Sequence, residues 1–158
     1  MDTSSNLNTD YTGIIEETYK DHNGLKQTRT YSRKRLIGRG GFARVYEVVD
    51  LQTDQVHACK IVSKSSLQKH RIKQKLMNEI KIHRSMRHSN IVNFHRVFED
   101  SDNVYILLEL CTNQTLHELI KRRKTLTEME AKNILMQVIS GLECVHSSRV
   151  IHLSLIHI

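Results

Sequence analysis

A glycine-rich segment is the first part of the chain whose residues could do chemistry. It occupies residues 38–45 and reads GRGGFARV. Glycines allow the backbone to approach phosphate oxygens, because no side chain stands in the way. In a dinucleotide-binding fold such a loop opens a helix, but residues 45–49 (VYEVV) are typical of a strand, and the Gly-Lys-Ser/Thr ending of a P-loop is missing. Two interpretations remain: a glycine hairpin folded over phosphates, or a plain glycine-rich turn.

A lysine follows on the next expected strand, residues 56–62. Alternate residues of a strand share a face, so Ala58, Lys60 and Val62 are expected to point the same way. A small residue beside a lysine suits a flat adenine ring next to a phosphate group. The alternative is a surface lysine on an edge strand, which is common.

Glu79 is the third residue of interest, and it lies in a segment with helical spacing, residues 67–86. A carboxylate on a core-facing stripe is costly unless it is paired, and Lys60 is the natural partner. Otherwise Glu79 is a residue at the edge of the stripe. The stripe itself consists of Ile72, Leu76, Ile80 and His83.

The remaining elements form a small antiparallel sheet followed by helices. Strands are expected on both sides of the glycine segment, at residues 56–62 and at residues 91–98 and 104–110. Thr115 with Glu118, and Thr127 with Glu130, have the spacing of capping boxes and predict two helix starts. The second helix carries an apolar face, formed by Ala131, Leu135, Val138, Ile139, Leu142 and Val145.

Composition excludes several classes of protein. The chain has 158 residues, of which 39% are hydrophobic and 26% charged, as in an ordinary globular domain. Its net charge of +7 is spread along the chain and only 5% of residues are aromatic, which favours a solvated surface over a nucleic-acid interface. The longest apolar run, residues 104–108, is too short to cross a membrane. The three cysteines are scattered, which fits reduced thiols, and no zinc-site spacing occurs.

From residue 31 to residue 152 the chain resembles the first half of a eukaryotic protein kinase domain, most of all that of the polo-like kinases. The order of glycine loop, Lys60 and Glu79 carries the kinase resemblance, together with residues 150–152 (VIH). The polo-like character is carried by residues 40–43 (GGFA), 98–100 (FED), 108–111 (LELC) and 121–128 (KRRKTLTE).

The resemblance implies an ATP site and assigns residues to it. Lys60 would bind the nucleotide phosphates and Glu79 would anchor Lys60, so these two are the expected catalytic residues. Leu108 would be the gatekeeper, and residues 109–111 the hinge that contacts adenine. The expected nucleotide-binding residues are Ile37, Gly38, Arg39, Gly40, Gly41, Phe42, Ala43, Arg44, Val45, Ala58, Lys60, Leu108, Glu109 and Cys111.

By the same resemblance the fold is α+β, a five-stranded kinase N-lobe with an αC helix and the first helices of a C-lobe. The expected divisions are a disordered leader (1–30), the N-lobe (31–110), the hinge and first C-lobe helices (111–152) and a non-native tail (153–158). ATP, Mg²⁺ and protein Ser/Thr substrates are the implied partners, in the cytoplasm or nucleus and at centrosomes and spindles. Nucleic acid and membrane are not expected as partners.

The resemblance also predicts that this chain is a fragment. A kinase would continue His152 with Arg-Asp-Leu, whereas residues 153–158 read LSLIHI, without the catalytic aspartate or the magnesium ligands. The leading hypothesis is therefore the ATP-binding part of a polo-like Ser/Thr kinase. The alternative is a short, non-catalytic isoform that binds nucleotide or a partner. A basic nucleic-acid-binding domain is a third and weaker hypothesis.

Overall fold

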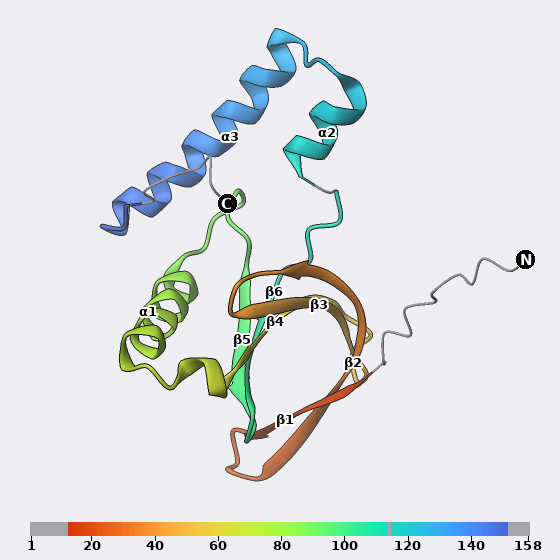
Figure 1. Cartoon of the computed structure of the whole chain (residues 1–158), viewed down its shortest axis with the longest axis vertical. Coiled ribbons are helices and arrows are strands. Elements are labelled where there is room, and N and C mark those ends of the chain that lie inside the picture. Colours follow the sequence, from red (N-terminus) through yellow and green to blue (C-terminus); the bar gives the residue numbers. More distant parts are fainter. Residues whose placement is uncertain (1–12, 114, 152–158) are drawn as a thin grey trace, which may run out of the picture. The chain divides into compact units, whose positions relative to one another are not determined.

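The computed structural model describes residues 13–113 and 115–151 (Figure 1). Residues 1–12 of the expected leader, His152 and the expected tail lie outside the described residues. The chain divides into a sheet unit, residues 1–67 and 97–110, and a helical unit, residues 68–96 and 111–158. The combination of an antiparallel sheet with helices confirms the α+β class.

The sheet has six strands in the order β1-β2-β3-β4-β6-β5. Neighbouring strands from β1 to β4 pair antiparallel, and β4 pairs antiparallel with β6. A short 3-10 helix, η1, spans Lys64–Leu67. The strands are β1 (Ile14–Lys20), β2 (Lys26–Arg39), β3 (Ala43–Asp50), β4 (Val56–Ser63), β5 (Phe94–Glu99) and β6 (Asn103–Leu108).

The expected disordered leader is wrong for the described residues from 14 onward. Residues 14–20 form β1, which pairs with the first half of β2 and adds a sixth strand to the five predicted. Two residues of this strand are buried, Ile15 and Glu17. The strand was hard to recognise because Glu17 carries a carboxylate where an apolar residue is expected. Glu17 tolerates burial because it accepts a hydrogen bond from the Tyr31 hydroxyl at 2.8 Å and lies 3.9 Å from Arg29.

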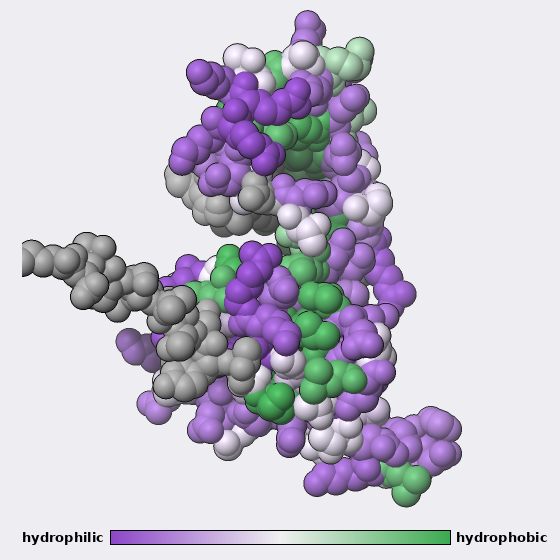
Figure 2. Space-filling model, turned by 90° about the vertical axis from the view of Figure 1, so that its right-hand side faces the viewer, coloured by the Kyte–Doolittle hydropathy of each residue, from purple (hydrophilic) through white to green (hydrophobic). Residues whose placement is uncertain are grey.

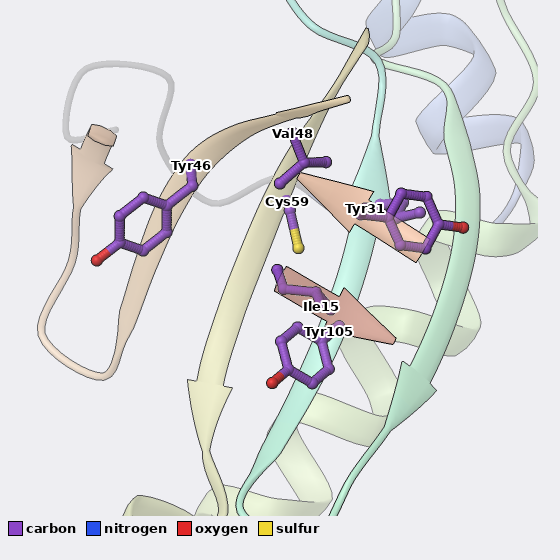
Figure 3. Close-up of a cluster of buried hydrophobic side chains, with 7 residues drawn as sticks. Ile15, Tyr31, Tyr46, Val48, Cys59 and Tyr105 are labelled. Atoms are coloured by element: carbon purple, nitrogen blue, oxygen red, sulfur yellow. The ribbon is translucent and has the colours of Figure 1, made fainter. Parts of the chain in front are cut away.

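The core of the sheet unit lies on one face of β3, β4 and β6. Tyr46, Cys59 and Leu107 are direct cross-strand neighbours on this face, and all three are buried. The β1–β2 hairpin contributes Ile15 and Tyr31 to the same cluster (Figure 3). We call this side the outer face. The alternation of a strand places Val45, Ala58 and Lys60 on the opposite side, which we call the inner face.

The helical unit contains α1 (His70–Ser85), α2 (Leu116–Arg123) and α3 (Glu128–Ser147). Leu76 and Ile80 are buried on α1, and Ile72 and His83 are half-buried, which confirms the predicted stripe. Both predicted helix starts are confirmed. Thr127 caps α3 in a complete capping box with Glu130, and Thr115 caps α2 by accepting a hydrogen bond from the Glu118 amide.

Within this unit, α3 contacts the segment that follows α1. Asn90 donates a side-chain hydrogen bond to Gln137 at 3.3 Å, and His88 lies 3.2 Å from the Ser140 hydroxyl. A methyl group at Gly141 would lie 3.2 Å from the Asn90 carbonyl oxygen, so glycine allows the close approach. Much of the apolar surface of α3 nevertheless remains exposed, and Figure 2 shows hydrophobic residues exposed among hydrophilic ones.

Candidate functional site

The glycine-rich segment forms the tight connection of a β-hairpin. β2 ends at Arg39 and β3 begins at Ala43, and the Gly40 amide donates a hydrogen bond to the Ala43 carbonyl oxygen at 2.8 Å. The segment leads into a strand, so the helix-opening loop of a dinucleotide-binding fold is excluded. A plain turn and a hairpin folded over phosphates both fit this geometry, so the contact with phosphates stays a prediction. A methyl group added at Gly41 would meet no atom within 4 Å. The outside of the hairpin tip is therefore open.

The strand register brings four of the expected nucleotide-binding side chains together on the inner face. Val45 on β3 is opposite Lys60 on β4, and Ala58 on β4 is opposite Leu108 on β6. Ala58 is buried, and Lys60 is half-buried. Ala58 and Lys60 share a face of β4, so a small side chain and an ammonium group lie next to each other there.

Arg39 and Arg44 of the expected set are cross-strand partners on the outer face, so their side chains lie on the opposite side of the sheet from Lys60. Ile37 is 38% exposed and Phe42 is 65% exposed at the hairpin. Glu109 and Cys111 follow β6 and are exposed, and Cys111 is not part of a disulfide. Cys111 belongs to the helical unit, whereas Glu109 belongs to the sheet unit.

Glu79 does not face the core of its helix, contrary to the sequence-based expectation. Leu76 and Ile80 on α1 are buried, whereas Glu79 is exposed. Each residue turns about 100° around a helix axis, so Glu79 lies at the edge of the buried stripe rather than within it. Lys60 lies in the sheet unit and Glu79 in the helical unit, and their pairing stays a prediction.

Sequence reasoning missed the polar groups that fasten the β1–β2 hairpin to the sheet. Arg29 lies 3.4 Å from Asp50 and 3.9 Å from Glu17, and both carboxylates are buried. Burial and the hydrogen bond to Glu17 raise the pKa of Tyr31 far above its usual value. The apolar residues Ile15 and Tyr19, four positions apart on one side of residues 14–20, are the weak signal that could have revealed the strand.

Arg33 was missed, and Arg39 and Arg44, which were expected at the nucleotide, lie with it in a group of arginines on the outer face. Arg33, Arg39 and Arg44 line a cavity in the sheet unit, beside the glycine hairpin. Register identifies this group, since Arg39 and Arg44 are direct cross-strand partners. The sequence alone does not show that Arg33 joins them.

Two further observations concern other kinds of site. Among residues 13–113 and 115–151, no three His, Cys, Asp or Glu side chains are grouped so that they could hold a metal ion. None of the helices in this part of the chain combines the length and the apolar character needed to span a membrane.

Comparison with known proteins identifies the family. The model of the protein kinase domain matches residues 31–155. A probable serine/threonine-protein kinase of Zea mays, named CCRP1, is 56% identical over 150 residues, which is 95% of this chain and 24% of the relative.

Two other relatives carry polo-like or cell-cycle names. The serine/threonine-protein kinase polo of Drosophila melanogaster is 51% identical over 128 residues, 81% of this chain and 22% of the relative. The cell cycle serine/threonine-protein kinase CDC5/MSD2 of Saccharomyces cerevisiae is 46% identical over 124 residues, 78% of this chain and 17% of the relative. The chain thus spans about a fifth of the length of the curated relatives it matches. It belongs to the protein kinase family, within the polo-like serine/threonine type.

Proposed function

We propose that this chain is the ATP-binding part of a serine/threonine protein kinase, which transfers the γ-phosphoryl group of ATP to protein Ser or Thr hydroxyls. One observation carries the proposal. The pairs Val45–Lys60 and Ala58–Leu108 share the inner face of the sheet beside a glycine hairpin. A flat apolar slot, an adjacent ammonium group and a side-chain-poor loop match the base and the phosphates of ATP.

Each group has a distinct physical role in this proposal. The adenine ring lies between Val45, Ala58 and Leu108, and backbone groups of residues 109–111 hydrogen-bond its edge. The Lys60 ammonium neutralises α- and β-phosphate oxygens, and the Glu79 carboxylate holds that ammonium in position. The hairpin covers the phosphates and excludes water, which strengthens these electrostatic contacts.

Magnesium supplies charge neutralisation of the phosphates when it is bound. The described residues contain no group of three metal-ligating side chains, so the proposal assigns them to the nucleotide alone. In the kinase family the metal-binding Asp and Asn and the catalytic Asp follow the segment that His152 begins. The share of the relatives that this chain covers agrees with a contribution of the nucleotide-binding part only.

Nucleotide binding by the 158-residue chain tests the proposal. Isothermal titration with ATP should show saturable binding that Lys60→Met weakens at least tenfold, because a charge-assisted contact to phosphate is lost. Lys34→Met removes the same charge from an exposed position on β2 and should leave the affinity unchanged. Equal binding by Lys60→Met and by the unaltered chain would contradict the assignment of Lys60.

Phosphoryl transfer distinguishes the kinase from the non-catalytic alternative. The proposal expects transfer to a Ser/Thr peptide by the protein that the gene encodes beyond His152, and sequencing the transcript through that codon identifies the residues after it. A transcript that continues into residues 153–158 and a stop codon would favour the nucleotide-binding module without transfer. A role in cell-cycle control is part of the proposal because a relative bears a cell-cycle name. Its location at centrosomes and spindles rests on the resemblance to polo-like kinases alone.

A further inference from the structure

A cavity of about 630 Å³ lies on the outer face of the sheet unit. The start of β1, the glycine hairpin, β3, β4 and β6 all contribute to it. Side chains that line it include Arg33, Arg39, Arg44, Tyr46, Ile61 and Tyr105. Its volume is in the range of ordinary ligand sites.

Residues 39–44 of the hairpin line this cavity and were also expected at the nucleotide, but strand register separates the strand side chains of the two sites. Arg44, Ile61 and Tyr105 form one cross-strand row on the outer face. The row formed by Val45, Lys60 and Ile106 is shifted by one residue and therefore lies on the inner face. The two sets of side chains are on opposite sides of the same three strands.

The charges around the cavity are of one sign. Three arginines line it, and none of the described residues in its lining is an Asp or a Glu. Arg39 and Arg44 are direct cross-strand partners, and like charges in such positions destabilise a sheet. An anion between them would remove this repulsion.

The third arginine is held in a fixed orientation. The Arg33 guanidinium lies over the Tyr46 ring, 4.8 Å from its centroid, and the Arg33 amide donates a hydrogen bond to the Gly13 carbonyl oxygen at 2.8 Å. Stacking uses the flat face of a guanidinium, while its five N–H donors lie in its plane. A guanidinium fixed in this way loses little entropy when it binds an anion.

Apolar and neutral polar groups complete the cavity. Ile15, Ile61 and the ring of Tyr105 are apolar surfaces, and Ser63 and Asn103 add neutral hydrogen-bonding groups. A cationic margin with an apolar floor fits an anionic side chain that has an apolar neighbour. A nucleic-acid backbone would instead need an extended basic groove with stacking surfaces.

We propose that the outer-face cavity binds a peptide segment whose anionic side chain, a phosphoserine or a glutamate, contacts Arg33, Arg39 and Arg44 while an adjacent apolar residue packs on Ile61 and Tyr105. This is a second binding site. It shares the glycine hairpin with the proposed nucleotide site, but the side chains proposed to contact the peptide lie on the outer face.

The test uses fluorescent peptide mixtures with one fixed central residue and four randomised positions on each side. The central residue is phosphoserine, serine, glutamate or glutamine, and binding to the 158-residue chain is measured by anisotropy. Phosphoserine should bind at least tenfold more tightly than serine, or glutamate more tightly than glutamine, and the pair with the larger ratio identifies the anion. Equal binding within both pairs would overturn the proposal.

Variants locate the binding. Arg33→Gln and Arg44→Gln should each weaken binding of the anionic mixture about tenfold. Lys34→Gln makes the same charge change at an exposed position of β2 outside the cavity lining and should have no effect. Ser63→Asp is a second kind of variant, which keeps all arginines but adds a negative charge to the lining, and it should give a similar loss. Equal losses in Lys34→Gln and Arg44→Gln would overturn the proposal.

Competition separates this site from other occupants. Saturating ATP, or Lys60→Met, should leave peptide binding within twofold of its original strength. Displacement by ATP would show that the peptides occupy the nucleotide site and would overturn the proposal. Binding of a 12-nucleotide single-stranded DNA that is tighter than peptide binding would assign the cavity to a nucleic acid. Peptide binding that appears only after deletion of residues 1–12 would assign it to this segment of the chain. Either result would also overturn the proposal.

Discussion

The Tyr31 hydroxyl donates a hydrogen bond to the Glu17 carboxylate at 2.8 Å, and both residues are buried. This bond joins β1 to the first half of β2. Arg29 extends the connection to Asp50 on β3. The family model begins its match at residue 31, after β1 has ended. The strand that precedes the matched region is therefore a built-in part of the sheet unit.

Removing the Tyr31 hydroxyl should destabilise the sheet unit. Tyr31→Phe leaves the buried Glu17 carboxylate without this donor, and we expect a loss of about 1–3 kcal/mol in the free energy of unfolding. Tyr19→Phe removes a hydroxyl from a half-buried position on β1 and serves as the matched control. Urea unfolding followed by circular dichroism measures both. Equal stability of the two variants would show that the bond contributes nothing.

Asp100 should stabilise the β5–β6 turn in a pH-dependent manner. Desolvation opposes its ionisation, but hydrogen bonds from Tyr105, Asn103 and Asp102 outweigh this and lower its pKa below the usual 3.8. A carboxyl group with a lowered pKa stabilises the fold above the unfolded-state pKa and loses this effect as the pH falls through the folded-state value.

Asp100→Asn should therefore cost on the order of 0.5–1 kcal/mol at pH 7, a small value because water competes at an exposed turn. The difference from the unaltered chain should shrink as the pH falls below about 4. Tyr105→Phe in the same series tests the 2.6 Å bond between these side chains. A stability difference that stays constant between pH 7 and pH 3 would contradict the role of the ionised carboxylate.

The three thiols should differ sharply in reactivity. Burial raises the pKa of Cys59 to about 12, whereas Cys111 is exposed and Cys144 is half-buried. Only the thiolate reacts with alkylating reagents, so iodoacetamide at pH 7.5 should label Cys111 first and Cys59 only after unfolding. Peptide mass spectrometry over a time course gives the order. Rapid labelling of Cys59 in the folded chain would contradict its burial in the outer-face core.

Gly40→Ala should separate nucleotide binding from folding. An added methyl group would lie 3.7 Å from the Ala43 carbonyl oxygen, an ordinary contact, so the free energy of unfolding should change by less than about 0.5 kcal/mol. A methyl group between the hairpin and the phosphates should nevertheless weaken ATP binding severalfold. Titration calorimetry and urea unfolding of one preparation measure the two effects. An unchanged ATP affinity would show that the hairpin does not approach the phosphates at this residue.

The exposed apolar face of α3 should make the 158-residue chain associate. Leu135 is 59% exposed and Ile139 is 47% exposed, and such surfaces favour contact with other molecules. Leu135→Glu should lower the light scattering of concentrated solutions, whereas Asn133→Glu, at an exposed polar position, should change it less. Equal effects of the two substitutions would indicate that added charge, rather than covered apolar surface, controls association.

The sequence predicted the elements whose patterns are local. The glycine hairpin, the alternation around Lys60 and the capping box at Thr127 each depend on spacing within a few residues, and the structure has all three. β1 was missed because Glu17 interrupts the apolar alternation of this strand. The burial of Glu17 depends on Tyr31, which lies fourteen residues away in the sequence. The grouping of Arg33 with Arg39 and Arg44 on the outer face was missed for the same reason, although Arg39 and Arg44 were expected at the nucleotide. Arg33 and Arg44 lie beside one cavity only because β2 folds back along β3, and linear order does not show this.

Lys60 and Ile61 are sequence neighbours that point to opposite sides of β4, so one layer of backbone divides the two proposed sites. A small molecule that binds the outer-face cavity would contact the glycine hairpin from the outer face of the sheet. Such a compound would not have to displace cellular ATP, and its selectivity among kinases would depend on the arginines rather than on the adenine slot.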